Sequence, residues 1–295
     1  MNRIDPQEYE SLIQNQLDRF VPEEKVIQSA LFRAMRYSLL AGGKRIRPIL
    51  VLEYCGLCGG DQQSALPFAC AVEMVHAYSL IHDDLPCMDD DDLRRGRPSN
   101  HVVFGEAQAL LAGDSLLTMA FETMLSPESI VAVGAERAAE AAGVLARASG
   151  AYGMAGGQAI DLEFEGQEIS FDVLRKMDEC KTGALILAAC RMGCVLGGAD
   201  EEQKKAADLY AKSIGLAFQI VDDILDVTGD TATLGKPAGS DIEKDKNTYV
   251  SALGIEKARQ TVEELTQTAV SALSVFPGDT GYLRNLALRL AERKS

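Results

Sequence analysis

Apolar residues recur at the spacing of a helix along almost the whole chain. In residues 30–43, four apolar side chains fall near one helical stripe before a Gly pair ends the pattern. Residues 65–84 are apolar nearly all round, which is typical of a helix buried at the centre of a bundle. Further helical patterns cover residues 135–148, 170–198 and 201–229. No segment alternates with a period of two between hairpin turns, so the pattern predicts an all-α protein of about ten or more helices.

The composition shows no sharp change along the chain and no Ser- or Pro-rich linker. We therefore expect a single domain that spans residues 1–295. Residues 227–249 differ from the rest, because they are rich in Gly, Asp, Thr and Lys and lack an apolar period. A loop of this length in a compact domain is usually functional or mobile.

The charge of the chain limits its possible partners. Of 295 residues, 47% are hydrophobic and 25% are charged, and the formal net charge is -15. A sequence-independent grip on nucleic acid needs a basic face, so we expect no nucleic-acid partner. In so acidic a chain, an anionic ligand has to be held by a local basic cluster or by metal ions.

The sequence carries no pattern of a secretory signal and no apolar run near 18 residues, the usual length of a membrane span. The best candidate runs are interrupted by Asp114 and Arg191. We therefore expect a cytoplasmic protein without stable membrane insertion.

Cys55 and Cys58 form a C-x-x-C pair, which can indicate redox or zinc chemistry. Because no second pair exists and this one lies in an apolar run, buried free thiols are favoured.

An acidic cluster lies in the segment "QIVDDILD". At about 100° per residue, its polar side chains share one helical face within an arc of about 100°. These are Gln219, Asp222, Asp223 and Asp226. The apolar residues between them point elsewhere, and an acidic stripe flanked by apolar residues is not typical of a solvated face.

The segment "HDDLPCMDDDDLRR" holds another cluster, which is the first along the chain, and in it Asp83 and Asp84 end an apolar helical pattern. On a continuous helix Asp89 would lie about 240° round from Asp83, too far to share a ligand. Pro86 disfavours helix at Leu85, so a local break there could return Asp89 to Asp83. We assign residues 90–92 no role beyond a solvated link.

Clustered carboxylates without His or Cys suit hard cations, and Mg²⁺ commonly completes its shell with substrate phosphates. Basic residues accompany both clusters: Arg94 and Arg95 follow the first, and Lys236 follows the second. The run "GGKRIRP" adds Lys44, Arg45 and Arg47. One cluster alone could be a solvated helix terminus, but two with basic companions indicate a site for Mg²⁺ and phosphate.

These motifs resemble those of the trans-prenyltransferases, the polyprenyl diphosphate synthases, and among them the bacterial-type farnesyl diphosphate synthases. "DDLPCMD" and "DDILD" are similar to the two aspartate-rich motifs of that family. "GGKRIRP", "HAYSLIHDDLP", "GQAIDLE", "KTGAL" and "LGKPAGSD" occur in the family in the same order. The resemblance implies a helical bundle of the isoprenoid synthase type around a deep central cavity, usually in a homodimer.

The resemblance also implies the reaction, in which an allylic diphosphate such as dimethylallyl or geranyl diphosphate condenses with isopentenyl diphosphate and releases pyrophosphate. Asp83, Asp89 and Asp222 would hold three Mg²⁺ ions on the allylic diphosphate. The auxiliary carboxylates would be Asp84, Asp223 and Asp226. Metal ions in such a site neutralise the charge that develops on the leaving diphosphate.

Basic side chains would bind the two diphosphates separately. The resemblance assigns Arg94, Lys181 and Lys236 to the allylic diphosphate. It assigns isopentenyl diphosphate to Lys44, Arg47, His76 and Arg95. Thr182, Gln219 and the Lys181 carbonyl oxygen would stabilise the allylic cation with their dipoles, and the loop carrying Lys236 would close to exclude water.

The length of the product would depend on the residues just before the first motif. In the family these positions form the floor of the cavity, and here they are Tyr78 and Ser79. A Tyr ring at that depth leads us to expect farnesyl diphosphate, with geranyl or geranylgeranyl diphosphate as alternatives.

A terpene cyclase is a further alternative, but it would have little use for the second set of basic residues. A di-iron bundle needs two Glu-x-x-His pairs, and this chain has one.

Overall fold

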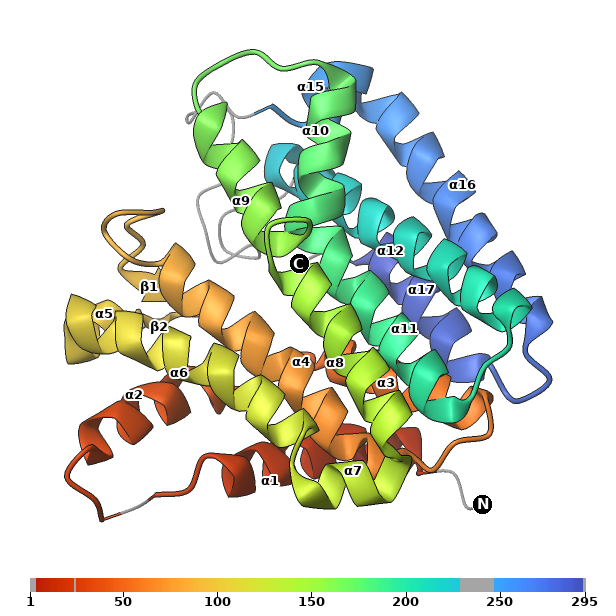
Figure 1. The fold of residues 1–295 in the computed structure, drawn as a ribbon. Helices are drawn as coiled ribbons and strands as arrows, with labels where there is room; N and C mark the ends of the chain where they lie inside the picture. The colour runs from red at the N-terminus through yellow and green to blue at the C-terminus, as the bar shows by residue number, and fades with distance from the viewer. Residues whose placement is uncertain (1–3, 24, 229–246, 294–295) are drawn as a thin grey trace. The chain divides into compact units, whose positions relative to one another are not determined.

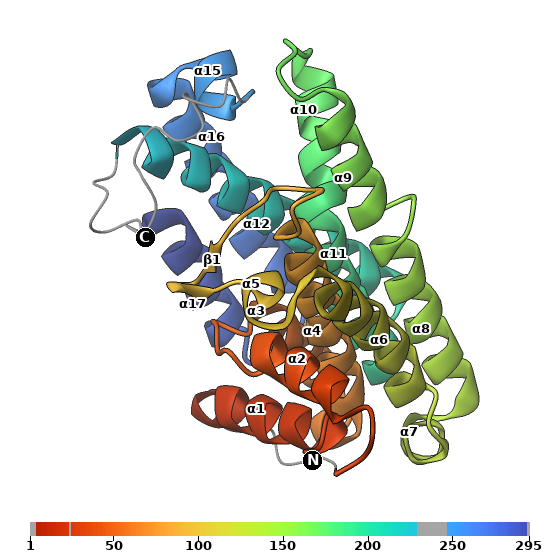
Figure 2. The same cartoon turned by 90° about the vertical axis from the view of Figure 1, so that its left-hand side faces the viewer.

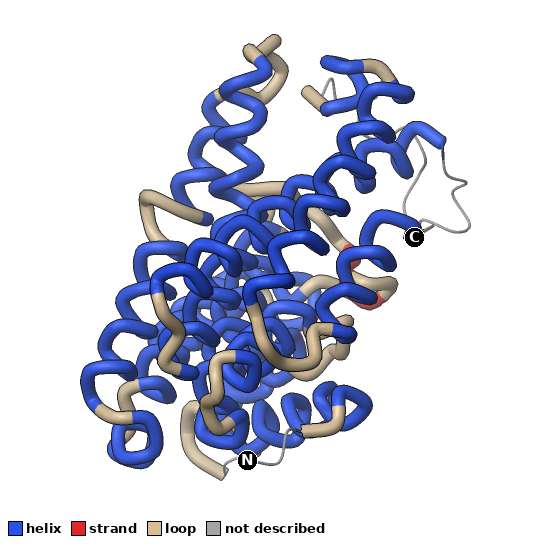
Figure 3. The backbone as a smooth tube through the Cα atoms, turned by 90° about the vertical axis from the view of Figure 1, so that its right-hand side faces the viewer, coloured by secondary structure: helices blue, strands red, loops and turns tan. Residues whose placement is uncertain are grey.

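The computed structural model describes residues 4–23, 25–228 and 247–293 (Figure 1). Over these residues the backbone consists of helices, their connecting loops and one two-stranded hairpin (Figure 3). The prediction of an all-α protein is confirmed. The hairpin was not predicted, because its strands, β1 (Leu93–Arg94) and β2 (Arg97–Pro98), are too short to show an alternating pattern.

The chain divides into two compact units, one of residues 1–143 and 195–198 (unit 1) and one of residues 144–194 and 199–295 (unit 2). A single domain over residues 1–295 stays a prediction. The helices that begin in unit 1 are η1 (Pro6–Glu8), α1 (Tyr9–Phe20), α2 (Ser29–Leu39), α3 (Ile46–Leu57), α4 (Gln62–Asp83), α5 (Asn100–Phe104), α6 (Glu106–Met124), α7 (Pro127–Val133) and α8 (Ala135–Ser149).

Helix α4 is the centre of unit 1. It packs against α1, α2, α3, α6 and α7 (Figures 1 and 2), and most of its side chains are buried. Asp61 caps its start by accepting a hydrogen bond from the Ser64 amide at 3.0 Å. The predicted central helix is therefore present, and the first acidic motif follows an element that is fixed by packing on all sides.

A buried polar network joins α1, α3 and α4. The Tyr9 hydroxyl donates to Glu53 Oε1 at 2.7 Å, and Gln62 Nε2 donates to the Tyr9 hydroxyl at 2.7 Å. Gln62 Nε2 also donates to the Leu52 carbonyl oxygen at 3.0 Å. Because buried polar groups are costly without partners, these bonds favour one arrangement of the three helices.

Unit 2 is built around α12. Its helices are α9 (Met154–Glu163), α10 (Phe171–Asp178), η2 (Glu179–Gly183), α11 (Ala184–Gly197), α12 (Glu201–Thr228), α15 (Tyr249–Leu253), α16 (Ile255–Ala272), η3 (Leu273–Val275) and α17 (Gly281–Glu292). Helix α12 packs against α16 and α17 (Figure 1). Its apolar side chains, including Ile220, Val221 and Ile224, form a core with Tyr249 of α15 and Val262 of α16. The predicted loop over residues 227–249 falls mostly outside the described residues.

Among the residues that the structure describes, two helices are long and apolar enough to cross a membrane by length and composition. They are α4 and the helix formed by residues 171–197, and α6 with α7 would add a third if this bent pair is one span. The sequence did not predict them, because polar residues interrupt the apolar run in each helix. In the most apolar windows of the two helices, 67% and 61% are buried inside the protein. The absence of membrane insertion stays a prediction.

Candidate active site

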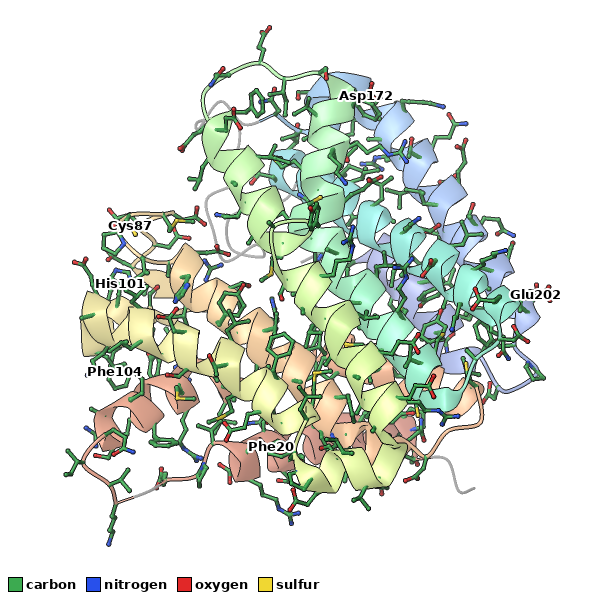
Figure 4. All side chains as sticks on the ribbon, viewed as in Figure 1. Phe20, Cys87, His101, Phe104, Asp172 and Glu202 are labelled. Carbon is green, nitrogen blue, oxygen red and sulfur yellow. The ribbon has the colours of Figure 1, made fainter. Side chains whose placement is uncertain are left out.

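The chain folds back directly after α4. The helix ends at Asp83, and the Asp89 amide donates to the Asp83 carbonyl oxygen at 2.9 Å. Pro86 lies inside the turn, where it lacks an amide hydrogen and restricts the preceding residue. Cys87 marks this turn in Figure 4. The predicted break is thus present, and it brings the backbones of Asp83 and Asp89 side by side.

The three carboxylates of this first motif differ in their access to solvent. Asp83 is half-buried, Asp89 is exposed, and Asp84 is only 3% exposed. Asp84 accepts a hydrogen bond from Arg94 Nε at 2.8 Å, and the two side chains form an ion pair. Burial raises the pKa of Asp84, and Arg94 beside it offsets part of that rise. Asp83 and Asp89 are the accessible pair, while Asp84 holds Arg94.

The accessible carboxylates fit a magnesium ion that also binds a substrate. Within the described part of the chain, no three His, Cys, Asp or Glu side chains are grouped closely enough to hold a metal by themselves. Mg²⁺ needs fewer, because it often uses one or two carboxylates and completes its shell with water and phosphate oxygens. Asp83 and Asp89 supply such a pair of oxygen donors.

A tight hairpin presents the two arginines that follow the acidic motif. Arg94 pairs with Arg97 across β1 and β2, with Arg95 and Gly96 between them. Arg95 and Gly96 have φ angles of 55° and 73°, and positive values at both positions suit a two-residue turn of type I′. The guanidinium of Arg95 donates to the carbonyl oxygen of Gly42 in the loop before α3.

This loop fits closely against Arg95. Gly43 has a φ of +132°, and a Cβ atom on it would lie 2.5 Å from Arg95 Nη1. Gly42 has a φ of +85°, but a Cβ atom there would meet nothing within 4 Å. Both positions favour glycine for its backbone freedom, while only Gly43 also leaves room for the Arg95 guanidinium.

A pocket in unit 1 gathers basic side chains. Its lining includes His76, Arg45, Arg94, Arg95 and Arg97. The acidic residues of the lining are both paired: Glu73 accepts from Arg45 at 2.5 Å, and Asp84 accepts from Arg94. The carboxylates of this pocket are therefore neutralised, and its remaining guanidinium groups favour an anion.

Positive charge surrounds His76. Burial lowers its pKa well below 6.5, and four arginines lower it further: Arg47, Arg95, Arg45 and Arg94. The imidazole is therefore neutral at pH 7. Arg47 Nε is buried without a hydrogen-bond partner, which is costly for a charged group. A bound anion would relieve both effects, and several positive groups together suit an anion with several charges, such as a diphosphate.

Two basic residues of the loop before α3 lie in different surroundings. Lys44 is exposed, whereas Arg45 is buried and has a φ of 45°. Besides Glu73, Arg45 contacts Gln14 Oε1 and the Leu39 carbonyl oxygen, each at 2.8 Å. The sequence placed Arg45 in a basic run without a role, and the structure shows that it ties this loop to α1, α2 and α4.

The second acidic motif lies on α12, as predicted. Its polar residues are not equally accessible: the Asp222 side chain is 45% exposed, whereas Asp223 and Asp226 are buried. Ile220 and Val221 point into the core of unit 2. The exposure of the carboxylates therefore differs along this helical face, and Asp222 is the accessible one.

Asp223 anchors the beginning of α15. It accepts a hydrogen bond from the Tyr249 amide at 2.7 Å and one from Gln219 Nε2 at 3.3 Å. The buried Asp178 lies nearby; burial raises the pKa of Asp178 to about 7, and the charge of Asp223 adds to the rise. Asp223 thus positions the backbone and orients Gln219, and its auxiliary role at a metal stays a prediction.

Lys181 and Thr182 lie in η2, a stretch of π-helix between α10 and α11. Such stretches occur frequently at functional sites. Lys181 Nζ donates to Asp161 Oδ2 of α9 at 2.6 Å, and both side chains remain about a third exposed (29% and 34%). A Cβ atom on Gly157 would collide with the Lys181 backbone, so this glycine permits α9 and η2 to approach. Asp161 was missed as a partner of Lys181, although it belongs to the quoted "GQAIDLE".

Three further predictions concern residues with different outcomes. Lys236 lies outside the described residues. Tyr78 is half-buried, and its ring meets that of His82 edge-on with centroids 5.6 Å apart. Ser79 is half-buried too, and its hydroxyl donates to the His76 carbonyl oxygen at 2.9 Å. Their role as a floor for the product stays a prediction.

The all-α fold, with one acidic motif after α4 and another on α12, is that of the isoprenoid synthases. The chain belongs to the Polyprenyl synthetase family, whose family model matches residues 28–274. It is thus a prenyltransferase of the isoprenoid synthase fold, and its activity is that of a prenyl diphosphate synthase. The resemblance predicted from the motifs is confirmed.

Similar proteins make products of more than one length. A heterodimeric geranylgeranyl pyrophosphate synthase large subunit from Arabidopsis thaliana is 46% identical over 91% of this chain and 72% of its own length. A geranylgeranyl pyrophosphate synthase from Catharanthus roseus is 48% identical over 83% of this chain and 69% of its own length. The crystal structure of a FPP/GFPP synthase from Zymomonas mobilis has a TM-score of 0.86 and 38% identity, covering 97% of this chain and 96% of that one. The expected farnesyl product is therefore not confirmed.

The prediction of a cytoplasmic protein is wrong. The similar plant proteins are named as chloroplastic. The expectation rested on the lack of a secretory signal and of a long apolar run, and neither feature separates cytoplasm from plastid. The homodimer stays a prediction, and one similar protein is the large subunit of a heterodimer.

Proposed function

We propose that the protein condenses isopentenyl diphosphate with allylic diphosphates in a Mg²⁺-dependent reaction and forms geranylgeranyl diphosphate in a plastid. The observation that carries this proposal is the basic pocket beside the first acidic motif. A pocket with paired carboxylates and several guanidinium groups suits a second diphosphate that no metal ion neutralises. Such a second diphosphate site is what a condensing enzyme needs and a terpene cyclase does not.

The accessible carboxylates would hold the metal ions. Asp83 and Asp89 fit this role through their exposure and their fold-back, and Asp222 fits it as the accessible member of the second motif. Bound Mg²⁺ would neutralise the charge that develops on the departing pyrophosphate. That three ions bind stays part of the proposal.

Isopentenyl diphosphate would bind to Arg95 and His76, which line the pocket, to Arg47, whose charge acts on His76, and to the exposed Lys44. The arginines suit the phosphate oxygens because their fork of donors can bind two oxygens at once. An entering diphosphate would favour protonation of His76, because it offsets the positive charges that now lower the pKa of this side chain. His76 would then act as a second donor.

Two proposed donors for the allylic diphosphate already contact a carboxylate. Arg94 is now paired with Asp84 and Lys181 with Asp161. Lys181 and Asp161 are both about a third exposed (29% and 34%), so Lys181 can exchange Asp161 for a diphosphate, whose negative charge is larger. Asp84 is buried, so Arg94 would keep its bond to Asp84 and bind the diphosphate with its remaining donors. Lys236 would complete the set.

Ionisation of the allylic substrate would leave a carbocation near Thr182 and Gln219. Their side-chain oxygens and the Lys181 carbonyl oxygen would stabilise it with oriented dipoles. Gln219 Nε2 donates to Asp223, so the amide oxygen is left for this task. The isopentenyl double bond would attack the cation, and the departing pyrophosphate would accept the proton that is lost.

The names of similar plant proteins support a twenty-carbon product, while Tyr78 favours farnesyl diphosphate as a second candidate. Burial raises the pKa of Tyr78, and the Asp83 charge adds to this, so its ring is a neutral obstacle close to the first motif. We predict that Tyr78→Ala lengthens the products relative to wild type. Products of unchanged length would show that Tyr78 does not form the floor.

The test is incubation of the protein with dimethylallyl and isopentenyl diphosphates and Mg²⁺, followed by analysis of the products by chain length. We expect condensation products, with the twenty-carbon diphosphate as the largest fraction. A fifteen-carbon end product would select the second candidate. Folded protein that forms no condensation product would refute the proposed function.

A further inference from the structure

The accessible carboxylate of the second motif already carries a cation. Arg293 follows α17, and its Nη2 donates to Asp222 Oδ1, a residue 71 positions earlier in the chain. The same Nη2 donates to the Phe218 carbonyl oxygen at 3.0 Å. The guanidinium carbon lies 3.9 Å from the centre of the Phe218 ring, within the range of a cation–π contact.

This contact is not a loose surface pair. The Arg293 side chain is only 11% exposed, and its Nε is buried without a hydrogen-bond partner. Burial lowers the pKa of Arg293, and Asp222 opposes the change, so the side chain remains charged at neutral pH. A charge with an unpaired donor is buried at some cost, which the contacts with Asp222 and Phe218 offset.

The docking of α17 does not depend on this arginine. The helix buries a row of apolar side chains in unit 2, namely Leu283, Leu286, Ala287 and Leu290. Another residue of the neighbouring α12, Tyr210, donates from its hydroxyl to the Leu283 carbonyl oxygen at 2.8 Å. The helix is therefore held by its own apolar face and by this hydrogen bond, and Arg293 is an addition directed at Asp222.

We propose that Arg293 is a resident cation that occupies Asp222 Oδ1 in the substrate-free enzyme and has to leave before this oxygen accepts a metal ion. The inference rests on the proposed function, because it takes Asp222 to be a metal ligand. A guanidinium and a divalent cation that bind the same carboxylate oxygen repel each other and compete for it. Metal alone therefore binds weakly, and the diphosphate, which brings additional negative charge, favours the exchange.

The same kind of pairing occurs at two other proposed site residues. Arg94 is held by Asp84, and Lys181 is held by Asp161. In those pairs a proposed diphosphate donor is held by a carboxylate, whereas at Asp222 a proposed metal ligand is held by a cation. Arg293 thus occupies a proposed metal ligand, just as Asp84 and Asp161 occupy proposed diphosphate donors.

The test measures Mn²⁺ binding to the full chain without diphosphate, from the electron paramagnetic resonance signal of free Mn²⁺. We expect Arg293→Gln to bind Mn²⁺ about fivefold more tightly than wild type, the size expected for loss of one partly exposed ion pair. Arg289→Gln, on the exposed side of α17, makes the same change in net charge and should bind as wild type does. Arg293→Met keeps the apolar contact with Phe218 and serves if the Gln variant melts early.

Unchanged or weaker Mn²⁺ binding by folded Arg293→Gln or Arg293→Met would overturn the inference. An equal gain in Arg289→Gln would also overturn it, because net charge would then be the cause. Asp222→Asn in the wild-type background tests the underlying assumption separately. If it does not weaken Mn²⁺ binding in the presence of pyrophosphate, the proposed metal role of Asp222 fails. If it does weaken binding while the Arg293 variants show no gain, only the resident-cation inference fails.

Discussion

Replacing Gly43 by Ala tests the basic pocket without removing any charge. The new Cβ would lie 2.5 Å from Arg95 Nη1, whereas ordinary contacts begin at 3.4 Å. The guanidinium is the flexible end of a long side chain, so it moves aside by about 1 Å. A misplacement of this size can lower the rate by about 100-fold. Loss of one hydrogen bond to a charged group costs about 1.5–3 kcal/mol. We therefore expect the KM for isopentenyl diphosphate to rise by about 10- to 100-fold.

Gly42→Ala is the matched control. Its φ of +85° is also unfavourable for Ala, but a Cβ atom there meets nothing within 4 Å. Steady-state kinetics with each substrate varied in turn should show a small effect of Gly42→Ala and a large effect of Gly43→Ala confined to isopentenyl diphosphate. Equal rises in both variants, or none in Gly43→Ala, would refute the assignment of Arg95 to this substrate.

Three other predictions concern charge. Glu73→Gln leaves the buried Arg45 without its counter-charge, so the free energy of unfolding in urea should fall by about 3 kcal/mol. Asp83→Ala should reduce turnover far more than Asp91→Ala, because Asp83 belongs to the fold-back and Asp91 lies beyond it. Asp178 has a folded pKa of about 7 against an ordinary 3.8, so the stability linked to its protonation is lost as the pH rises through that window. Asp178→Asn should lack this loss in unfolding measured between these pH values.

Each of these has a result that contradicts it. Asp18→Asn breaks an exposed pair with Arg36 and should cost less than about 1 kcal/mol; an equal cost for Glu73→Gln would mean that burial does not strengthen the inner pair. Equal losses of turnover in the Asp83 and Asp91 variants would show that the wrong carboxylates were chosen. A pH profile of Asp178→Asn identical to wild type would exclude Asp178 as the titrating group.

The parts of the fold that follow from local physics were predictable from the sequence. Helix α4 is apolar all round and α12 keeps its acidic residues on one face, and both patterns need only the helical period. The return of Asp89 to Asp83 followed from Pro86, which acts on the residue directly before it. In these cases the determining residues lie within a few positions of each other.

The partners of the charged site residues could not be predicted in this way. Lys181 and Asp161 are 20 residues apart, and Arg293 and Asp222 are 71 apart. Such pairs depend on which helices pack together, and helical period does not determine that. The partner of Asp223 could not be predicted for the same reason, because the amide that donates to it belongs to Tyr249, 26 residues later in the chain.

The cytoplasmic prediction failed for a different reason. Hydropathy and composition govern solubility and membrane insertion, and a plastid protein can share both with a cytoplasmic one. Product length is only partly predictable from the sequence. The position of Tyr78 just before the first motif can be read from the sequence, but the space in front of its ring depends on all the residues of the pocket.

The central claim is that the basic pocket makes this protein a condensing enzyme. It is tested most directly by counting pyrophosphate released from geranyl diphosphate against isopentenyl diphosphate consumed, in the presence of Mg²⁺. We predict one pyrophosphate for each isopentenyl diphosphate, and almost none when isopentenyl diphosphate is left out. Release of pyrophosphate at the same rate without isopentenyl diphosphate would contradict the claim and indicate a cyclase or a hydrolase.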